Sequence, residues 1–99
     1  MKVRVELDPQ VAGFVRALAP EPRKRLREAL RGLEQEKGDL NQLEADLAGY
    51  ARLRVRGYRV IVRFYADRGQ RVARCVFAEK RAVVCELFAE ILRGPSAGE

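Results

Sequence analysis

The residues with the clearest chemical potential are the arginines in the second half of the chain. From Gly49 to Arg81 the sequence has ten basic residues and only two acidic ones, and all but one of the ten are arginine. A guanidinium is planar, binds phosphate through two parallel hydrogen bonds and stacks on bases, whereas a lysine ammonium acts as a point charge. Together with the formal net charge of +6 at pH 7, this composition predicts a polyanionic, phosphate-bearing partner.

The spacing of these arginines predicts that several of them share one face of a β-hairpin. A two-residue turn at Arg56-Gly57 sets Arg54 opposite Arg59 and sorts the side chains into two faces. The arginine face holds Arg52, Arg54, Arg59, Arg63 and Ile61, and the face that packs on the helices holds Leu53, Val55, Tyr58, Val60, Val62 and Phe64. Like charges directly opposite each other destabilise a sheet by up to about 1 kcal/mol, and a bound anion would remove that cost. The alternative is that the arginines only solvate an exposed sheet face.

The rest of the chain supplies the elements that hold this hairpin. Hydrophobic periodicity predicts a strand over 2–7, helices over 9–18 and 21–37, the hairpin, a strand over 71–78 and a helix over 82–92. Residues 40–49 fit either a short turn of helix or a loop anchored by leucines. The fold class is therefore α+β: an N-terminal strand, a helical hairpin, an antiparallel β-meander packed against the helices, and a short C-terminal helix.

We expect one domain over residues 1–99, with the helices covering one face of the sheet. The mixed charges of helix 21–37 are typical of an ordinary solvated face, so this helix is assigned no chemistry.

The sequence offers little to a metal ion or a membrane. There is no histidine, and the two cysteines, Cys75 and Cys85, lack the CxxC spacing of zinc sites. We therefore predict free, buried thiols, no metal and no cofactor. No segment approaches the roughly 20 apolar residues that span a bilayer, and the first residues, MKVRVE, do not resemble a signal peptide. The expectation is a cytoplasmic protein with no membrane partner.

The segment LAGYARLRVRGYRVIVRFY, followed by a strand and then AEKRAVVCELF, resembles the RelE/ParE toxin superfamily of type II toxin-antitoxin systems. The helical hairpin before it agrees, so the resemblance covers nearly the whole chain. The segment RLRVRGYRVIVRF resembles the RelE-like branch more than the ParE-like branch. The RelE-like branch implies an endoribonuclease that cuts translated messages, an mRNA interferase that inhibits translation.

This resemblance also implies a set of site residues. The catalytic residues would be Arg52, Arg54, Arg59 and Arg81, and the RNA-binding residues would be Arg56, Arg63, Lys80 and Cys85. Cys85 stands where RelE-type nucleases usually have a tyrosine that stacks on a base, a contribution of about 1–3 kcal/mol. Either another ring such as Tyr65 or Phe88 takes that role, or the activity is weak.

The implied reaction is attack of a ribose 2′-OH on the adjacent phosphate, with arginines neutralising the charge that builds on the phosphoryl oxygens. A general base is missing from the implied set, because there is no histidine and an arginine is a poor proton acceptor near neutral pH.

Two other readings of the same residues stay open. A ParE-like toxin would inhibit DNA gyrase without cutting RNA, and a weakened relative would only bind nucleic acid. The expected partners of a toxin are mRNA, the ribosome and a cognate antitoxin. An acidic or amphipathic segment of the antitoxin would lie over the basic face or in a groove beside the helices.

Overall fold

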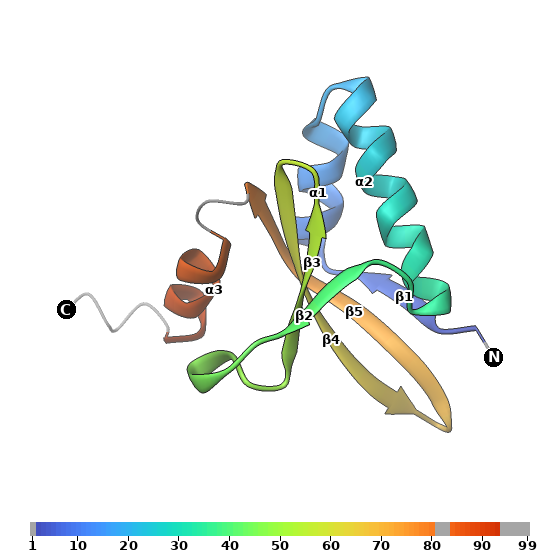
Figure 1. The fold of residues 1–99 in the computed structure, drawn as a ribbon, viewed down its shortest axis with the longest axis vertical. Helices are drawn as coiled ribbons and strands as arrows, with labels where there is room; N and C mark the ends of the chain where they lie inside the picture. Colours follow the sequence, from blue (N-terminus) through green and yellow to red (C-terminus); the bar gives the residue numbers. More distant parts are fainter. Residues whose placement is uncertain (1, 81–83, 94–99) are drawn as a thin grey trace.

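The computed structural model describes residues 2–80 and 84–93. In chain order its elements are β1 (Arg4–Leu7), α1 (Pro9–Ala17), α2 (Pro20–Gly32), η1 (Leu33–Gln35), β2 (Asp39–Gln42), η2 (Ala45–Leu47), β3 (Tyr50–Val55), β4 (Tyr58–Asp67), β5 (Gln70–Lys80) and α3 (Val84–Arg93), where η marks a short 3-10 helix. Figure 1 shows a twisted sheet seen nearly edge-on, with α1 and α2 on one side and α3 on the other. The predicted α+β class is confirmed.

The sheet has five strands in the order β1-β5-β4-β3-β2. Strands β2 to β5 form the predicted antiparallel meander, and β1 joins its end in parallel with β5. The meander has one strand more than the sequence indicated, because residues 39–42 pair with β3 as an edge strand. The undecided segment 40–49 thus begins as strand and continues as the 3-10 turn η2.

The helices begin where the sequence predicts and α2 ends earlier. A proline occupies the first turn of both α1 and α2, where its missing N–H costs nothing. The predicted helix 21–37 stops at Gly32 and continues as η1 to Gln35. Glu36 then takes a left-handed conformation and the Lys37 N–H donates to the Gly32 carbonyl at 3.0 Å, which closes the helix end.

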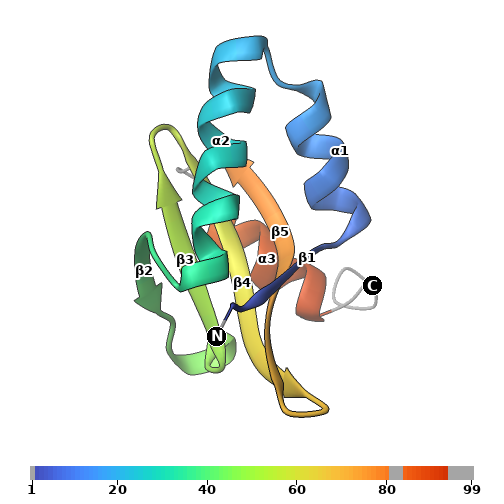
Figure 2. The same cartoon turned by 90° about the vertical axis from the view of Figure 1, so that its right-hand side faces the viewer.

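Two apolar clusters lie on opposite faces of the sheet. The larger one joins α1 and α2 to the inward side chains of the strands, among them Val15, Leu26, Leu53 and Val62. The smaller one consists of Leu47, Ile61, Phe77 and Phe88, with Phe88 contributed by α3. Figure 2 shows α1 and α2 in front of the sheet and α3 behind it. The two helices of the predicted helical hairpin, α1 and α2, thus cover one face of the sheet as expected, and α3 covers the other.

α3 packs on this face of the sheet because the arginine face has an apolar centre. Ile61, which the hairpin alternation places among the arginines, lies opposite Phe77, and both are buried. An irregularity in the pairing of β4 with β5 follows at once, since Val62 pairs with Cys75 rather than with Val76. An apolar patch of this size needs a cover, and α3 supplies it.

Candidate nucleic-acid interface

The hairpin register is the one that the sequence predicts. Arg54 lies opposite Arg59 and Arg52 opposite Ile61, around a turn in which Gly57 has a φ of +81°. Because side chains alternate along a strand, Arg52, Arg54, Arg59 and Arg63 point away from α1 and α2. We call this side of the sheet the arginine face.

Arg54 and Arg59 form a cross-strand pair of like charges near the hairpin turn. The Arg59 side chain is half-buried, and its Nη1 donates to the carbonyls of Val55 at 3.1 Å and Tyr58 at 2.7 Å. Arg54 is exposed, and its Nε lies 3.8 Å from a carboxylate oxygen of Asp39, which is exposed too. An exposed ion pair at that distance contributes little. The pair therefore presents two guanidinium groups at one end of the arginine face.

Arg52 adds an unsatisfied donor next to this pair. The residue is half-buried, and its Nε is a buried atom with no hydrogen-bond partner in the described part of the chain. Its neighbours in the sheet are Asn41 on β2 and Ile61 on β4. A buried donor without an acceptor costs about 1–3 kcal/mol. An anionic ligand that reached Arg52 would remove this cost.

The rings near α3 belong to the small apolar cluster. Phe88 is 5% exposed, and its ring centroid lies 5.0 Å from that of Tyr50 and 5.9 Å from that of Phe77. Phe88 is thus packed against other rings and is not open to a base in this arrangement. Tyr65 is half-buried on the arginine face, with the Arg63 guanidinium 5.8 Å from its ring centroid. Of the two rings considered as replacements for the missing tyrosine, Tyr65 is the accessible one.

Between Gly49 and Arg81, basic residues outnumber acidic ones in the sequence. Ion pairs in the folded structure reduce this excess of positive charge. Arg74 pairs with Asp8 at 2.7 Å, and Arg4 pairs with Asp67 at 2.9 Å. These hydrogen bonds raise the pKa of Arg74 and of Arg4 above its ordinary value. Arg71 bonds to Glu36 at 3.0 Å on the side of the helices. Asp8 and Glu36, which a count over the segment alone leaves out, neutralise Arg74 and Arg71, whereas Asp67 of the segment pairs with Arg4 outside it.

The remaining predicted site residues lie in different places. Arg56 is exposed in the hairpin turn, while Lys80 lies opposite Tyr58, so its register position is on the side of α1 and α2. Arg81 lies outside the described residues. Cys85 lies in α3, and its side chain is outside the described part of the structure. The structure thus places Arg52, Arg54, Arg59 and Arg63 on one face of the sheet, with Arg63 farther from the hairpin turn, and does not place Lys80 there.

Cys75 is a packing residue. It is fully buried in the large apolar cluster, and burial raises the pKa of its thiol to about 12. A thiol that stays protonated is a poor nucleophile and a poor metal ligand. Among the described residues there is also no group of three histidine, cysteine, aspartate or glutamate side chains that could hold a metal ion. None of the described helices is long and apolar enough to cross a membrane.

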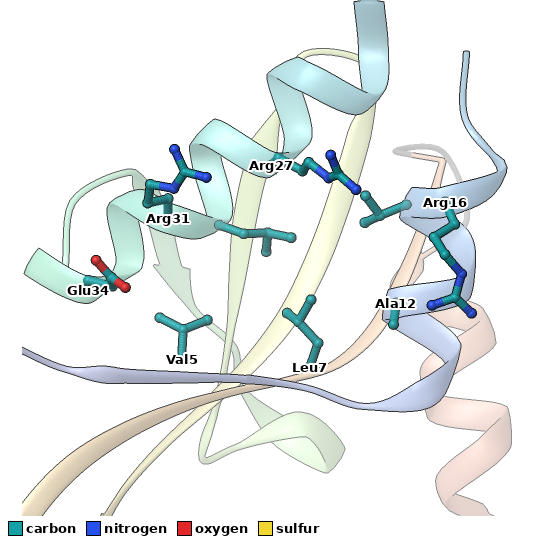
Figure 3. A pocket seen from close by; sticks show the side chains of 9 residues that line it. Val5, Leu7, Ala12, Arg16, Arg27, Arg31 and Glu34 are labelled. Carbon is teal, nitrogen blue, oxygen red and sulfur yellow. The ribbon is translucent and has the colours of Figure 1, made fainter. Parts of the chain in front are cut away.

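A groove beside the helices, which the resemblance implied as one of two places for an antitoxin segment, lies on the other side of the sheet, and its lining residues were not predicted from the sequence. It has a volume of about 430 Å³ and lies between β1, α1 and α2 (Figure 3). Its lining is apolar at Val5, Leu7, Ala12, Val15 and Leu30, and charged at Arg16, Arg27, Arg31 and Glu34. Leu7 is 41% exposed there and adds apolar surface to the groove. From the sequence, the mixed charges of helix 21–37 indicate a face exposed to solvent. The sequence does not show that this helix borders an apolar groove. We call this feature the helix groove.

Comparisons with known proteins place this arrangement among solved toxin structures. No protein-family model and no curated protein sequence matches the chain. The toxin-antitoxin complex RelBE2 from Mycobacterium tuberculosis matches with a TM-score of 0.69 and 20% identity, covering 82% of this chain and 100% of that one. The archaeal RelE-RelB complex from Pyrococcus horikoshii OT3 matches with a TM-score of 0.63 and 27% identity, covering 83% and 98%.

A YoeB/ParE toxin from Agrobacterium tumefaciens matches with a TM-score of 0.64 and 13% identity, covering 80% of this chain and 99% of that one. Each match spans nearly the whole of the solved chain, so the likeness concerns the complete domain. The chain therefore has the fold of the RelE/ParE toxin superfamily, which confirms the resemblance that its central arginine motif carries.

Proposed function

We propose that this protein is the toxin of a toxin-antitoxin pair and that it cleaves messenger RNA bound on its arginine face. The observation that carries the proposal is the cross-strand pair Arg54–Arg59 beside the unsatisfied Nε of Arg52. Several guanidinium groups on one face of the sheet, next to a buried donor without an acceptor among the described residues, favour an anionic ligand over simple solvation. The shared fold with toxins of toxin-antitoxin complexes supports the same role.

The proposed RNA cleavage uses two properties of guanidinium groups, phosphate binding and positive charge. Arginines on the sheet would bind successive phosphates and neutralise the charge that develops when a ribose 2′ oxygen attacks the adjacent phosphorus. The bond from the 2′ oxygen to phosphorus forms, the bond from phosphorus to the 5′ oxygen breaks, and a 2′,3′-cyclic phosphate remains. Positioning and charge neutralisation account for such a step, and they match the residues that the arginine face holds.

The proposal predicts new RNA ends when the protein is made alone. Induction without an antitoxin in a bacterial host should stop growth within minutes and produce new 5′ ends in translated messages, in register with codons. Sequencing of 5′ ends checks this outcome. Growth arrest with a DNA-damage response and no new ends would replace the proposal with a gyrase-directed toxin. Normal growth would indicate a weakened relative.

We also propose that the antitoxin segment lies in the helix groove. None of Arg16, Arg27 and Arg31 has a carboxylate within 4.0 Å in the part of the chain that the structure describes, and the rest of the groove lining is apolar except for Glu34. A partner with acidic side chains flanking apolar ones would satisfy both features. The groove lies on the opposite side of the sheet from Arg54 and Arg59, so a partner that also masks the arginine face has to pass around a sheet edge.

Reversing one charge in the helix groove should weaken the antitoxin complex. Arg27→Glu is expected to raise the Kd for the cognate antitoxin roughly tenfold, because it replaces attraction by repulsion at the groove rim. Titration calorimetry on the purified pair measures the change. Arg25→Glu is the matched control, since Arg25 is exposed on the same helix but does not line the groove. Equal affinities for both variants would place the antitoxin elsewhere.

A further inference from the structure

A second pair of like charges lies at the other end of the arginine face. Arg63 on β4 is directly opposite Arg74 on β5, and Glu6 on β1 is the register partner of Arg74. A carboxylate and two guanidinium groups thus form a row across three neighbouring strands. The Tyr65 side chain, two residues beyond Arg63 on the same face, joins the row by donating its hydroxyl hydrogen to Oε1 of Glu6 at 3.0 Å.

Ion pairing alone does not account for this cluster. Arg74 has its own carboxylate, Asp8, at 2.7 Å. Arg63 has no carboxylate within 4.0 Å in the described ranges, and its guanidinium lies over the Tyr65 ring instead. Arg63 therefore keeps a guanidinium charge without a carboxylate partner beside the Arg74–Asp8 ion pair, and a phosphate bound there would supply one.

Glu6 is held beside this pair with a defined orientation. Tyr65 bonds to one oxygen of its carboxylate, and the Nε of Arg4 donates to the other at 3.1 Å. A carboxylate has about four acceptor positions, so both oxygens keep the capacity to accept another hydrogen. The Glu6 side chain is 37% exposed, which leaves it accessible from the arginine face. The charged or titratable groups around it are Arg4 on its own strand, Tyr65 and Asp67 on β4, and Arg74 on β5.

We propose, on the basis of the RNA-cleaving function proposed above, that Glu6 is the general base of the reaction and that the scissile phosphate binds between Arg63 and Arg74. The Glu6 carboxylate takes the proton of the ribose 2′-OH, and the 2′ oxygen forms a bond to phosphorus. The bond from phosphorus to the 5′ oxygen breaks, and solvent water protonates the leaving oxygen. Tyr65 and Arg4 are positioning residues that hold the carboxylate, and Arg63 and Arg74 neutralise the phosphoryl oxygens.

The two arginine pairs then have different roles on one RNA strand. Arg63 lies four residues after Arg59 on β4, which corresponds to roughly 13 Å along a strand. Arg52 lies on the same face between the two pairs along β3, opposite Ile61, which α3 covers. The pair Arg54–Arg59 would hold a phosphate away from the cut, while the pair Arg63–Arg74 holds the phosphate that reacts. This division also provides the proton acceptor that the arginine set by itself lacks.

The test separates proton transfer from RNA binding. Purified protein is added to ribosomes translating a short labelled message, and kcat and KM for cleavage are measured. Glu6→Gln keeps the size of the side chain and an oxygen for the Tyr65 hydroxyl but is not a base. Its kcat should fall by roughly 100-fold, with KM within about twofold of the wild-type value. Glu6→Asp, which restores a carboxylate, should recover part of kcat.

A matched control excludes a merely structural effect. Glu36→Gln removes the same charge and breaks a comparable exposed ion pair, that of Glu36 with Arg71, on the other side of the sheet. Its kcat should equal that of the wild type, and its Tm should match that of Glu6→Gln. If Glu6→Gln fails to fold, Tyr65→Phe serves instead, since it removes only the hydroxyl that positions Glu6 and should lower kcat without changing KM.

The outcomes distinguish this inference from the function on which it rests. Cleavage by Glu6→Gln at the wild-type rate overturns the role of Glu6 and leaves the ribonuclease proposal standing. A folded wild-type protein that binds RNA without cutting it overturns both. A parallel loss of kcat and Tm in Glu6→Gln, with unchanged kcat in folded Tyr65→Phe, would reduce Glu6 to a structural residue.

Discussion

The double variant Arg54→Ala/Arg59→Ala is expected to abolish growth arrest and RNA cleavage while the protein stays folded. The two guanidinium groups face each other across the β3–β4 pair, so both contact the same stretch of a bound strand. Each phosphate contact to a single strand contributes about 0.7 to the slope of log affinity against log salt, so losing two should reduce the slope by about 1.4. The affinity for single-stranded RNA should fall with it.

Three measurements check this expectation. They are growth after induction, the yield of new 5′ ends, and RNA affinity at several salt concentrations. Removing two opposed like charges should change the free energy of unfolding by no more than about 1 kcal/mol, which thermal unfolding can show. Arg23→Ala/Arg25→Ala removes the same charge from α2, on the other side of the sheet, and should keep both arrest and salt slope. Arrest and cleavage that persist in the hairpin variant would show that RNA binds another surface.

Leu53→Ala should cause the largest loss of stability among single changes in the hairpin. Leu53 is 1% exposed and lies between Leu40 on β2 and Val60 on β4 in the large apolar cluster. A β-carbon on Gly38 would lie 2.8 Å from Leu53 Cδ1, so the side chain is packed against backbone on that side. Truncating such a residue leaves a cavity and costs about 2–5 kcal/mol. A typical domain has only about 5–15 kcal/mol of stability in total.

Urea unfolding followed by circular dichroism measures this loss. The matched control is Leu92→Ala in α3, because Leu92 is 48% exposed and its truncation should change the free energy of unfolding by no more than about 0.5 kcal/mol. A loss below about 1 kcal/mol for Leu53→Ala would mean that the sheet and α2 pack less closely at this point than the structure indicates.

Local sequence predicts best those features of the fold that depend on a few neighbouring residues. Gly57 accepts the positive φ that a two-residue turn needs, and the strict alternation beside it leaves one register that buries Leu53 and Val55 together. The hairpin and its arginine face follow from about a dozen neighbouring residues. The start of α1 at Pro9 and of α2 at Pro20 depends on equally local chemistry.

The features that sequence reasoning missed depend on partners far along the chain. β2 is an edge strand whose assignment requires β3 beside it, and only Leu40 of its four residues contacts the large apolar cluster. The lining of the helix groove combines residues of β1, α1, α2 and η1, and no single segment carries a signal for that set. The cover of Ile61 by α3 was missed because one apolar residue among arginines does not show which element will pack on it.

The amino-acid sequence alone determined the α+β class, the arginine hairpin with its register, and the superfamily fold that its motif resembles. Only the tertiary structure decided which of the basic residues have acidic partners. Asp8 meets Arg74 and Asp67 meets Arg4 across more than sixty positions of the chain, and Tyr65 meets Glu6 because β1 pairs with β5 next to β4. Backbone periodicity is set by neighbouring residues, whereas the partner of a charge depends on which strands lie side by side in the folded sheet.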